Sequence, residues 1–180
     1  MFTVGHSNRT LDEFTELLKA HRMSVLVDVR AVPRSRHNPQ FNRETLPHML
    51  EAEGIAYEHL PGLGGLRRAS KDSMNTGWRN ASFRGYADYM QTEEFARNLA
   101  VLTQIEAPRT PAIMCAEAVP WRCHRWLIAD ALTIRGIPVM HIVSAARAEP
   151  HQLTSFARVE GTRIMYPGPE LELFGPDVMP

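Results

Sequence analysis

The sequence predicts an α/β fold: a single domain in which about five strands form a mostly parallel central sheet flanked by helices. Strand-like and helix-like stretches alternate through residues 1–143, the order that strand–helix–strand units produce. Residues 25–29 are rich in valine and apolar apart from Asp28, which is typical of a strand buried on both faces. A chain of 180 residues, 44% of them hydrophobic, suits one domain with a buried core.

The first half alternates predicted strands and helices and then enters a long loop. Thr10 and Glu13 have the spacing of a capping box that begins a helix. Gly54 is placed to end the second helix. Residues 61–85 contain five glycines and are expected to form a functional or mobile loop. The elements expected before this loop are strands at 1–7, 25–29 and 55–60 and helices at 10–18 and 43–54.

The second half predicts two helices and two strands before a less regular tail. In the tail, Pro150 is expected to open a short helix and residues 163–166 to form a short strand. The last dozen residues contain three prolines and are expected to be a surface tail. Residues 1–145 are therefore assigned to the α/β domain and residues 146–180 to an extension that packs on it. The remaining elements are helices at 86–105 and 123–136 and strands at 110–117 and 137–143.

Charge and composition exclude several classes of protein. The 20 basic and 20 acidic residues cancel, so a strongly basic surface for nucleic acid is not indicated. Nine Arg or Lys and five Asp or Glu lie between Arg30 and Arg84, which favours a local anion site. No apolar run approaches the ~18 residues of a membrane span, and the N-terminus lacks the apolar region of a signal peptide. Two cysteines are no disulfide framework, so a cytoplasmic protein is expected.

Polar residues follow nearly every predicted strand, although the strand bodies are apolar. The carboxyl ends of parallel strands share one edge of the sheet, where ligands bind in such folds. We therefore expect these polar groups to converge on one site. They are His6 and Ser7 after the first strand, Asp28 and Arg30 after the second, His59 after the third, Cys115 and Glu117 after the fourth, and His141 on the fifth.

The two cysteines leave several interpretations open. Cys115 at a strand end can be a small buried hydrophobe. Cys123 lies near a helix N-terminus and Arg125, which would lower a thiol pKa and make it a nucleophile, or it can be inert. With His124 and His6 they could bind metal, but the spacing between the cysteines matches no standard zinc module, so no metal ligand is assigned. A disulfide is not expected in a reducing compartment.

Two carboxylates have roles that the sequence does not settle. Glu117 just beyond a buried strand is a candidate general acid or base, or it forms an ion pair with Arg122, Arg125 or Arg30. Asp28 lies between valines, and a buried carboxylate needs a partner. Arg30, two residues later on the same face of the strand, can supply it.

Arginines and glycines near these ends predict an anion site. Several cations could clamp a phosphate or carboxylate. Glycines in the loop after the third strand allow close backbone approach to a ligand, although this is no P-loop. The cations are Arg30, Arg34, Arg36, His37, Arg43 and Arg125, and the glycines are Gly62, Gly64 and Gly65.

The motifs Gly-His-Ser, Asp-Val-Arg with a Pro and a Ser nearby, Leu-Gly-Gly, and Cys-Ala-Glu followed by Cys-His-Arg resemble those of the family of domains of unknown function 488 (DUF488). The resemblance extends over residues 3–142 and implies a compact α/β domain with a shared polar site, but no reaction. By position it assigns to that site Gly5, His6, Ser7, Asp28, Arg30, Pro33, Ser35, Leu63, Gly64, Gly65, Cys115, Glu117, Cys123, His124 and Arg125.

The favoured hypothesis is a hydrolase or group transferase acting on a small anionic, nucleotide-like ligand, or on nucleic acid, at the sheet edge. Its catalytic candidates are Glu117, Cys115, Cys123 and His6, and its ligand-binding candidates are Ser7, Asp28, Arg30, Arg34, Ser35, Gly64, Gly65, His124 and Arg125. No cofactor is identified. One alternative is a non-catalytic nucleotide or nucleic-acid binding module that stacks bases on Trp78, Phe83, Tyr86 and Trp121. Another is a Cys/His metal-binding protein.

Overall fold

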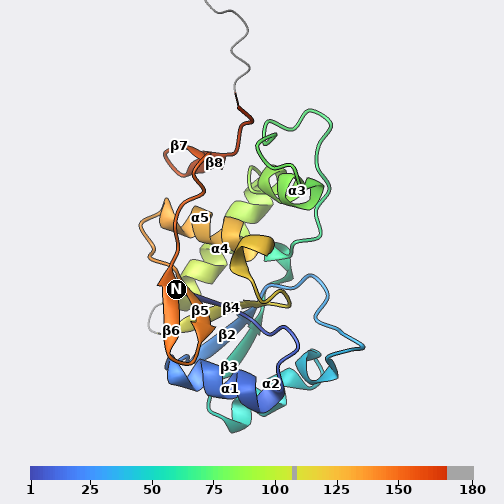
Figure 1. Ribbon diagram of the computed structural model, residues 1–180, viewed down its shortest axis with the longest axis vertical. Helices are drawn as coiled ribbons and strands as arrows, with labels where there is room; N and C mark the ends of the chain where they lie inside the picture. Colours follow the sequence, from blue (N-terminus) through green and yellow to red (C-terminus); the bar gives the residue numbers. More distant parts are fainter. Residues whose placement is uncertain (107–108, 170–180) are drawn as a thin grey trace, which may run out of the picture.

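The computed structural model describes residues 1–106 and 109–169, which form an α/β domain around a six-stranded sheet (Figure 1). The strand order is β3-β2-β4-β1-β5-β6; the first five strands are parallel and β6 is antiparallel to β5. The strands are β1 Phe2–Gly5, β2 Val25–Asp28, β3 Ala56–His59, β4 Pro111–Cys115, β5 Met140–Ser144 and β6 Arg147–Pro150. The predicted fold class is confirmed, with one strand more than expected.

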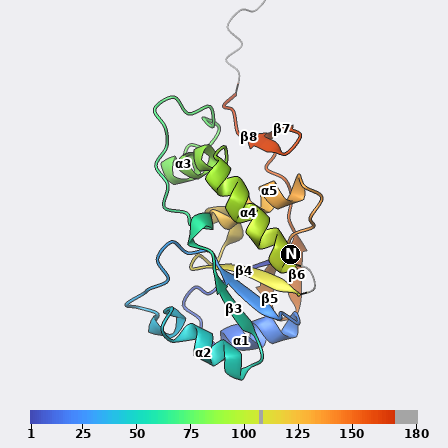
Figure 2. The same ribbon diagram turned by 180° about the vertical axis from the view of Figure 1, so that it is seen from behind.

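Helices cover both faces of the sheet. The α-helices are α1 Leu11–Ala20, α2 Leu46–Ala52, α3 Ala81–Tyr89, α4 Glu93–Glu106 and α5 Arg125–Thr133. Three 3-10 turns are η1 Pro39–Phe41, η2 Pro61–Leu63 and η3 Pro120–Arg122. Helices α1 and α2 lie on one face, and α4 and α5 lie on the other with α3 beyond them (Figures 1 and 2).

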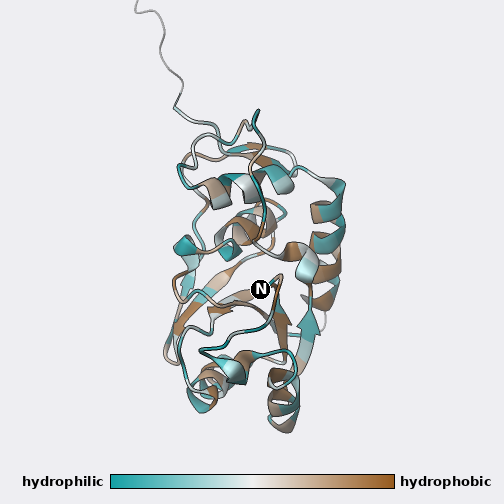
Figure 3. Cartoon of the chain, turned by 90° about the vertical axis from the view of Figure 1, so that its right-hand side faces the viewer, coloured by the Kyte–Doolittle hydropathy of each residue, from teal (hydrophilic) through white to brown (hydrophobic). Residues whose placement is uncertain are grey.

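The sheet separates two apolar cores, as the alternation along β2 illustrates. Val25 and Val27 pack into the core beneath α4 and α5, whereas Leu26 packs into the core beneath α1 and α2. All four residues of β2 are buried. The apolar strands run through the middle of the molecule in Figure 3. Burial of both faces explains the continuous apolar run from which this strand is predicted.

The order of the strands places the carboxyl end of β4 at a point where the chain changes direction. The chain leaves β1 and β2 toward helices α1 and α2 on one face. It leaves β4, which lies between them, toward α5 on the other face (Figures 1 and 2). Loops that diverge to opposite faces open a crevice at the carboxyl edge, which is where ligands bind in such sheets.

The predicted helix over 86–105 is wrong in its bounds, because two helices occupy this region. Helix α3 begins earlier, where the Asn80 side chain accepts hydrogen bonds from the backbone N–H groups of Ser82 (2.8 Å) and Phe83. A break follows, and the Thr92 hydroxyl caps α4 by accepting from the N–H of Phe95 (3.2 Å). The apolar periodicity continues from α3 into α4 and predicts one helix, but the capping side chains of Asn80 and Thr92 begin two separate helices.

The region after 145 also differs from expectation. Pro150 ends strand β6 instead of opening a helix; β6 is an edge strand, where a residue without an N–H is tolerated. The predicted short strand is confirmed as β8 Arg163–Met165, which pairs with β7 Arg158–Glu160. Tyr166 beyond it is buried in the core. The predicted surface tail lies almost wholly outside the described residues.

No helix in the described part of the chain is both long enough and apolar enough to cross a membrane.

Candidate functional site

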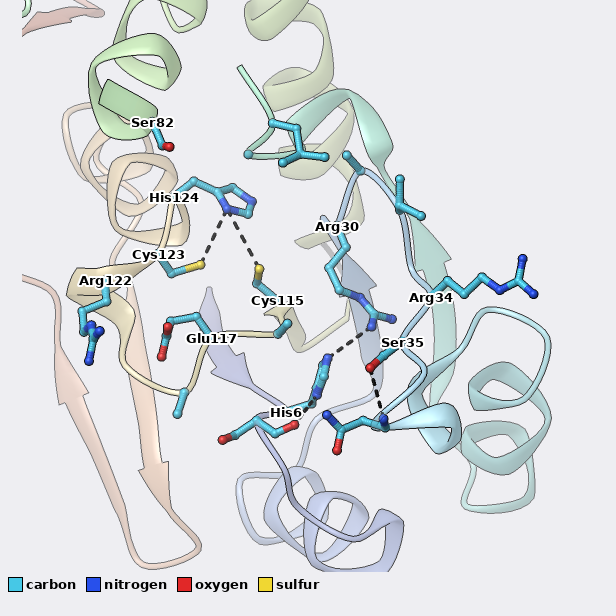
Figure 4. A pocket seen from close by; sticks show the side chains of 18 of the residues that line it. His6, Arg30, Arg34, Ser35, Ser82, Cys115, Glu117, Arg122, Cys123 and His124 are labelled. Atoms are coloured by element: carbon cyan, nitrogen blue, oxygen red, sulfur yellow. Dashed lines mark hydrogen bonds between the residues drawn. The ribbon is translucent and has the colours of Figure 1, made fainter. Parts of the chain in front are cut away.

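An open cavity of about 780 Å³ lies at the carboxyl edge of the sheet, in the crevice around the end of β4 (Figure 4). Its wall comes from parts of the segments 6–8, 30–38, 65–66, 82–83, 115–118 and 122–124. The predicted convergence therefore brings together ten of the candidate residues. They are His6, Ser7, Arg30, Arg34, Ser35, Gly65, Cys115, Glu117, Cys123 and His124.

Asp28 and Arg30 form a buried ion pair under the cavity floor. Nη2 of Arg30 lies 2.6 Å from Oδ2 of Asp28, and Nε donates to Oδ1 at 2.9 Å. The Tyr57 hydroxyl also donates to Oδ2 (2.8 Å), and burial together with the Asp28 charge raises the pKa of Tyr57. Asp28 is fully buried and does not line the cavity. The expected partnership of these two residues is confirmed.

Most donors of Arg30 are used within the protein. Besides Asp28, Nη2 donates to the carbonyl of Phe41 (2.7 Å) and Nη1 to Nε2 of His6 (3.2 Å). A guanidinium has five N–H groups. The bonds to described residues occupy four of them, which leaves one N–H at Nη1 for a ligand. The main role of Arg30 is therefore to hold the cavity wall together, and only one N–H group remains to contact a ligand.

His6 is a neutral, fully bonded imidazole. Nδ1 lies 2.8 Å from the carbonyl of Ser7, which can only accept, so Nδ1 carries the hydrogen and Nε2 accepts from Arg30. The ring stacks on Phe41 at 4.2 Å, and burial lowers the pKa of His6 to about 4. Both ring nitrogens are engaged, so His6 in this arrangement positions Arg30.

Cys115, Cys123 and His124 form a cluster on the cavity wall (Figure 4). Nδ1 of His124 lies 3.6 Å from Sγ of Cys123 and 4.0 Å from Sγ of Cys115, and the three atoms all lie within 4.8 Å of one another. Both cysteines are buried and free. The interaction between the two thiol groups raises the pKa of Cys115, as burial also does, and lowers the pKa of Cys123.

Arg125 lies behind the cavity wall and does not line it. It is only 1% exposed. Its Nε donates to Sγ of Cys123 and its Nη1 to Oγ1 of Thr3, each at 3.4 Å, while Nη2 donates to the carbonyl of Glu117. All three contacts tie the loop after β4 to the sheet and to α5. The prediction that Arg125 binds the ligand is therefore wrong for this structure, in which Arg125 supports the cysteine cluster from behind the cavity wall.

The two glycines predicted for the site have different surroundings. A Cβ on Gly65 would come within 2.5 Å of Nδ1 of His124, so this glycine lets the imidazole approach the backbone. A Cβ on Gly64 would meet Ala31 at 2.8 Å. Gly64 does not line the cavity, and its role is to pack against the loop after β2.

Glu117 lines the cavity with its carboxylate unpaired by any arginine. It is half-buried, and Oε1 accepts a hydrogen bond from the N–H of Val119 (3.3 Å). Among the described residues no cation forms an ion pair with Glu117. The alternative that this carboxylate pairs with an arginine is therefore wrong. Arg122 and Arg34, both exposed, lie on opposite sides of the opening (Figure 4).

Several lining residues were not predicted as ligand groups. Arg122 is expected from sequence only as a partner of Glu117, and Ser82 lies at the start of a helix whose beginning is predicted too late. The asparagine cap at residue 80 is the signal that could have revealed Ser82. Asn8 follows the first strand directly and could have been included on that ground.

The aromatic residues proposed for base stacking are mostly elsewhere. Tyr86 is fully buried and its hydroxyl donates to the carbonyl of Leu63 (2.9 Å). Trp78 packs between Phe83 and Tyr166, with ring centroids 4.8 and 5.5 Å away. Phe83 alone of the four proposed residues lines the cavity. His141 is also remote, since it pairs with Thr3 in the middle of the sheet.

A family model described as "Domain of unknown function DUF488" matches residues 10–132. The chain belongs to the DUF488 family. The match includes the cavity-lining residues that follow β2, the end of β4, the cysteine cluster and Glu117. Searches of curated proteins and of solved structures found no match. Membership in DUF488 brings no reaction with it, so the chemistry of the site has to be argued from its geometry.

Proposed function

We propose that this DUF488 chain is a hydrolase or group transferase that acts on a small anionic, nucleotide-like ligand in the cavity at the end of β4. The observation that carries the proposal is the cluster of Cys115, Cys123 and His124 within 4.8 Å, on the wall of a cavity of about 780 Å³. Cavities of ~300–1,000 Å³ hold small-molecule ligands. Three potentially reactive side chains on such a wall favour chemistry over binding alone.

Charge around the opening favours an anionic ligand. Arg34 and Arg122 are exposed on opposite sides of it, and one N–H of Arg30 remains for a ligand on the floor. Guanidinium groups bind phosphate oxygens through paired hydrogen bonds. The Phe83 ring on the wall offers a face for a nucleobase.

Glu117 supplies the acid–base chemistry in this proposal. Its carboxylate lines the same cavity as the cluster, two residues after Cys115, and keeps acceptor capacity beyond its bond to Val119. A positioned carboxylate can remove a proton from an attacking group or return one to a leaving group. His6 cannot do so in the present arrangement, because both of its nitrogens are engaged.

The test begins with mass spectrometry of ligands that co-purify with the chain, followed by turnover assays on nucleotides and phosphodiesters related to what is found. Glu117→Gln should retain ligand affinity and lose at least ~100-fold in turnover, the scale of general acid–base catalysis. Glu160→Gln, an exposed glutamate in the β7–β8 hairpin, is the matched control and should change neither. Ligand binding without turnover in the unmodified protein would overturn the proposal in favour of a binding module.

A further inference from the structure

We propose that Cys115, Cys123 and His124 are the protein ligands of a divalent metal ion, of the Zn²⁺ type, whose fourth coordination position opens into the cavity. This inference rests on the proposed function, since it assigns the reacting centre of the same site. The three ligand atoms, two sulfurs and Nδ1, already lie within 4.8 Å of one another. Thiolate and imidazole donors together select zinc-like ions over Mg²⁺ or Ca²⁺.

The spacing of the ligand atoms fits a tetrahedral ion. Zinc bonds of ~2.3 Å to sulfur and ~2.0–2.1 Å to nitrogen, at tetrahedral angles, separate the ligand atoms by ~3.6 Å for S–N and ~3.8 Å for S–S. The His124 nitrogen lies 3.6 Å from the Cys123 sulfur and 4.0 Å from the Cys115 sulfur. Both S–N separations are thus within a few tenths of an ångström of the required value, whereas the two sulfurs, which lie within 4.8 Å of each other, would have to approach by up to ~1 Å.

The His124 ring packs against Tyr86, with ring centroids 5.2 Å apart, but its nitrogens lack good hydrogen-bond partners among the described residues. Nδ1 faces only the two sulfurs, at distances long for strong hydrogen bonds, and Nε2 is buried without a partner. Neutral imidazoles buried in proteins normally satisfy their nitrogens with oxygen or nitrogen partners. The ring also lies so close to the Gly65 backbone that a Cβ on this glycine would come within 2.5 Å of Nδ1. A metal bond at Nδ1 would supply the missing interaction.

The surroundings of the cluster suit metal-bound thiolates. Nε of Arg125 donates to the Cys123 sulfur at 3.4 Å, and the same guanidinium is held by Thr3 and by the Glu117 carbonyl. Hydrogen bonds to ligand sulfurs from a fixed outer group are usual in metal sites. Two thiolates also neutralise a divalent ion, so the buried centre carries no net charge. Metal binding releases the two thiol protons to solvent and involves no oxidation.

The open fourth position connects the ion with catalysis. All three ligand residues line the cavity, and so does Glu117, which is not a member of the cluster. Catalytic zinc sites use three protein ligands and leave one position for water or substrate, whereas structural sites are closed by a fourth. A carboxylate beside an open Cys/Cys/His site is the arrangement that zinc deaminases use to activate water. Glu117 would hold and transfer the proton here.

The experiment uses the full chain, purified without a histidine tag, with metal content measured by elemental mass spectrometry. About one zinc or iron per chain is expected. After removal of the metal, one equivalent of Co²⁺ should produce thiolate-to-cobalt charge-transfer absorption and the visible bands of tetrahedral cobalt. Cys115→Ser, Cys123→Ser and His124→Ala should each weaken Co²⁺ binding at least ~100-fold, since outer-shell changes alone cost 10–100-fold. Glu117→Gln should bind Co²⁺ like the unmodified protein.

The Co²⁺ experiment on the unmodified chain tests the metal site even if the ligand variants fail to fold. Two free thiols with no cobalt absorption, or a disulfide between Cys115 and Cys123 in protein prepared under reducing conditions, would overturn the metal site. Turnover that survives complete chelation would also overturn it while leaving the proposed enzyme intact. One bound metal without turnover on any anionic ligand would support the site and count against the enzyme.

Discussion

Two buried histidines should make the folded state sensitive to mild acid. Burial lowers the pKa of His6 to about 4 and that of His141 to about 3, from 6.5. A base whose pKa is lowered by folding takes up its proton more readily in the unfolded chain. The unfolded state is therefore favoured progressively as pH falls from about 6.5 toward the folded pKa. Between pH 7 and pH 5 each histidine should remove about 2 kcal/mol from the free energy of unfolding.

Urea unfolding at pH 7 and pH 5, in EDTA so that metal binding does not contribute, measures this loss. His6→Gln should remove about 2 kcal/mol of the pH dependence, because the varied side chain no longer titrates. His48→Gln, on the exposed side of α2, is the matched control and should leave the pH dependence as it was. NMR titration of the His6 ring gives the folded pKa directly. Equal pH dependence in the unmodified chain and His6→Gln would refute the reasoning.

Three further predictions concern single contacts. Asp28→Asn leaves the Arg30 charge buried without its partner and should lower the free energy of unfolding by about 3–5 kcal/mol in urea; a loss under ~1 kcal/mol would mean the pair is solvated. Gly65→Ala places a Cβ within 2.5 Å of Nδ1 of His124 and should weaken Co²⁺ binding ~10-fold or more, with circular dichroism unchanged. Gly54→Ala meets no atom within 4 Å but has φ of +73°, so thermal unfolding should show a cost of only about 1–2 kcal/mol.

The central strands could be predicted because burial on both faces gives them an unambiguous apolar pattern. Every residue of β2 and β4 is buried, and the capping box at Thr10 forms as expected. The peripheral strands lack that signal. β6 and β7 are partly or fully exposed and contain charged residues, so their composition resembles that of a loop. Pairing with a neighbour, which the local sequence does not encode, makes them strands.

The candidate site was predictable in outline for a similar reason. Parallel strands end at one edge, so His6, Arg30 and Cys115 had to converge once the fold class was known. The direction of each side chain was not predictable. Arg125, the first residue of α5, turns away from the cavity because the Cys123 sulfur and the Glu117 carbonyl take its donors behind the wall. The direction of a side chain such as Arg125 depends on partners that only the folded structure brings near it.

The sequence indicates that Cys115, Cys123 and His124 could bind a metal together, but it does not predict their geometry, because a loop that the rest of the fold holds in place sets the spacing of the three side chains. After β4 the chain continues to pair with β1, since the N–H of Ser7 donates to the carbonyl of Ala116 at 2.9 Å. It then passes so close over the end of β1 that a Cβ on Gly5 would lie 2.0 Å from the Glu117 carbonyl oxygen. Any side chain at Gly5 would push this loop outward. The seven residues between Cys115 and Cys123 thus fold back over β1, and that path, not a short sequence motif, brings the two sulfurs to one imidazole.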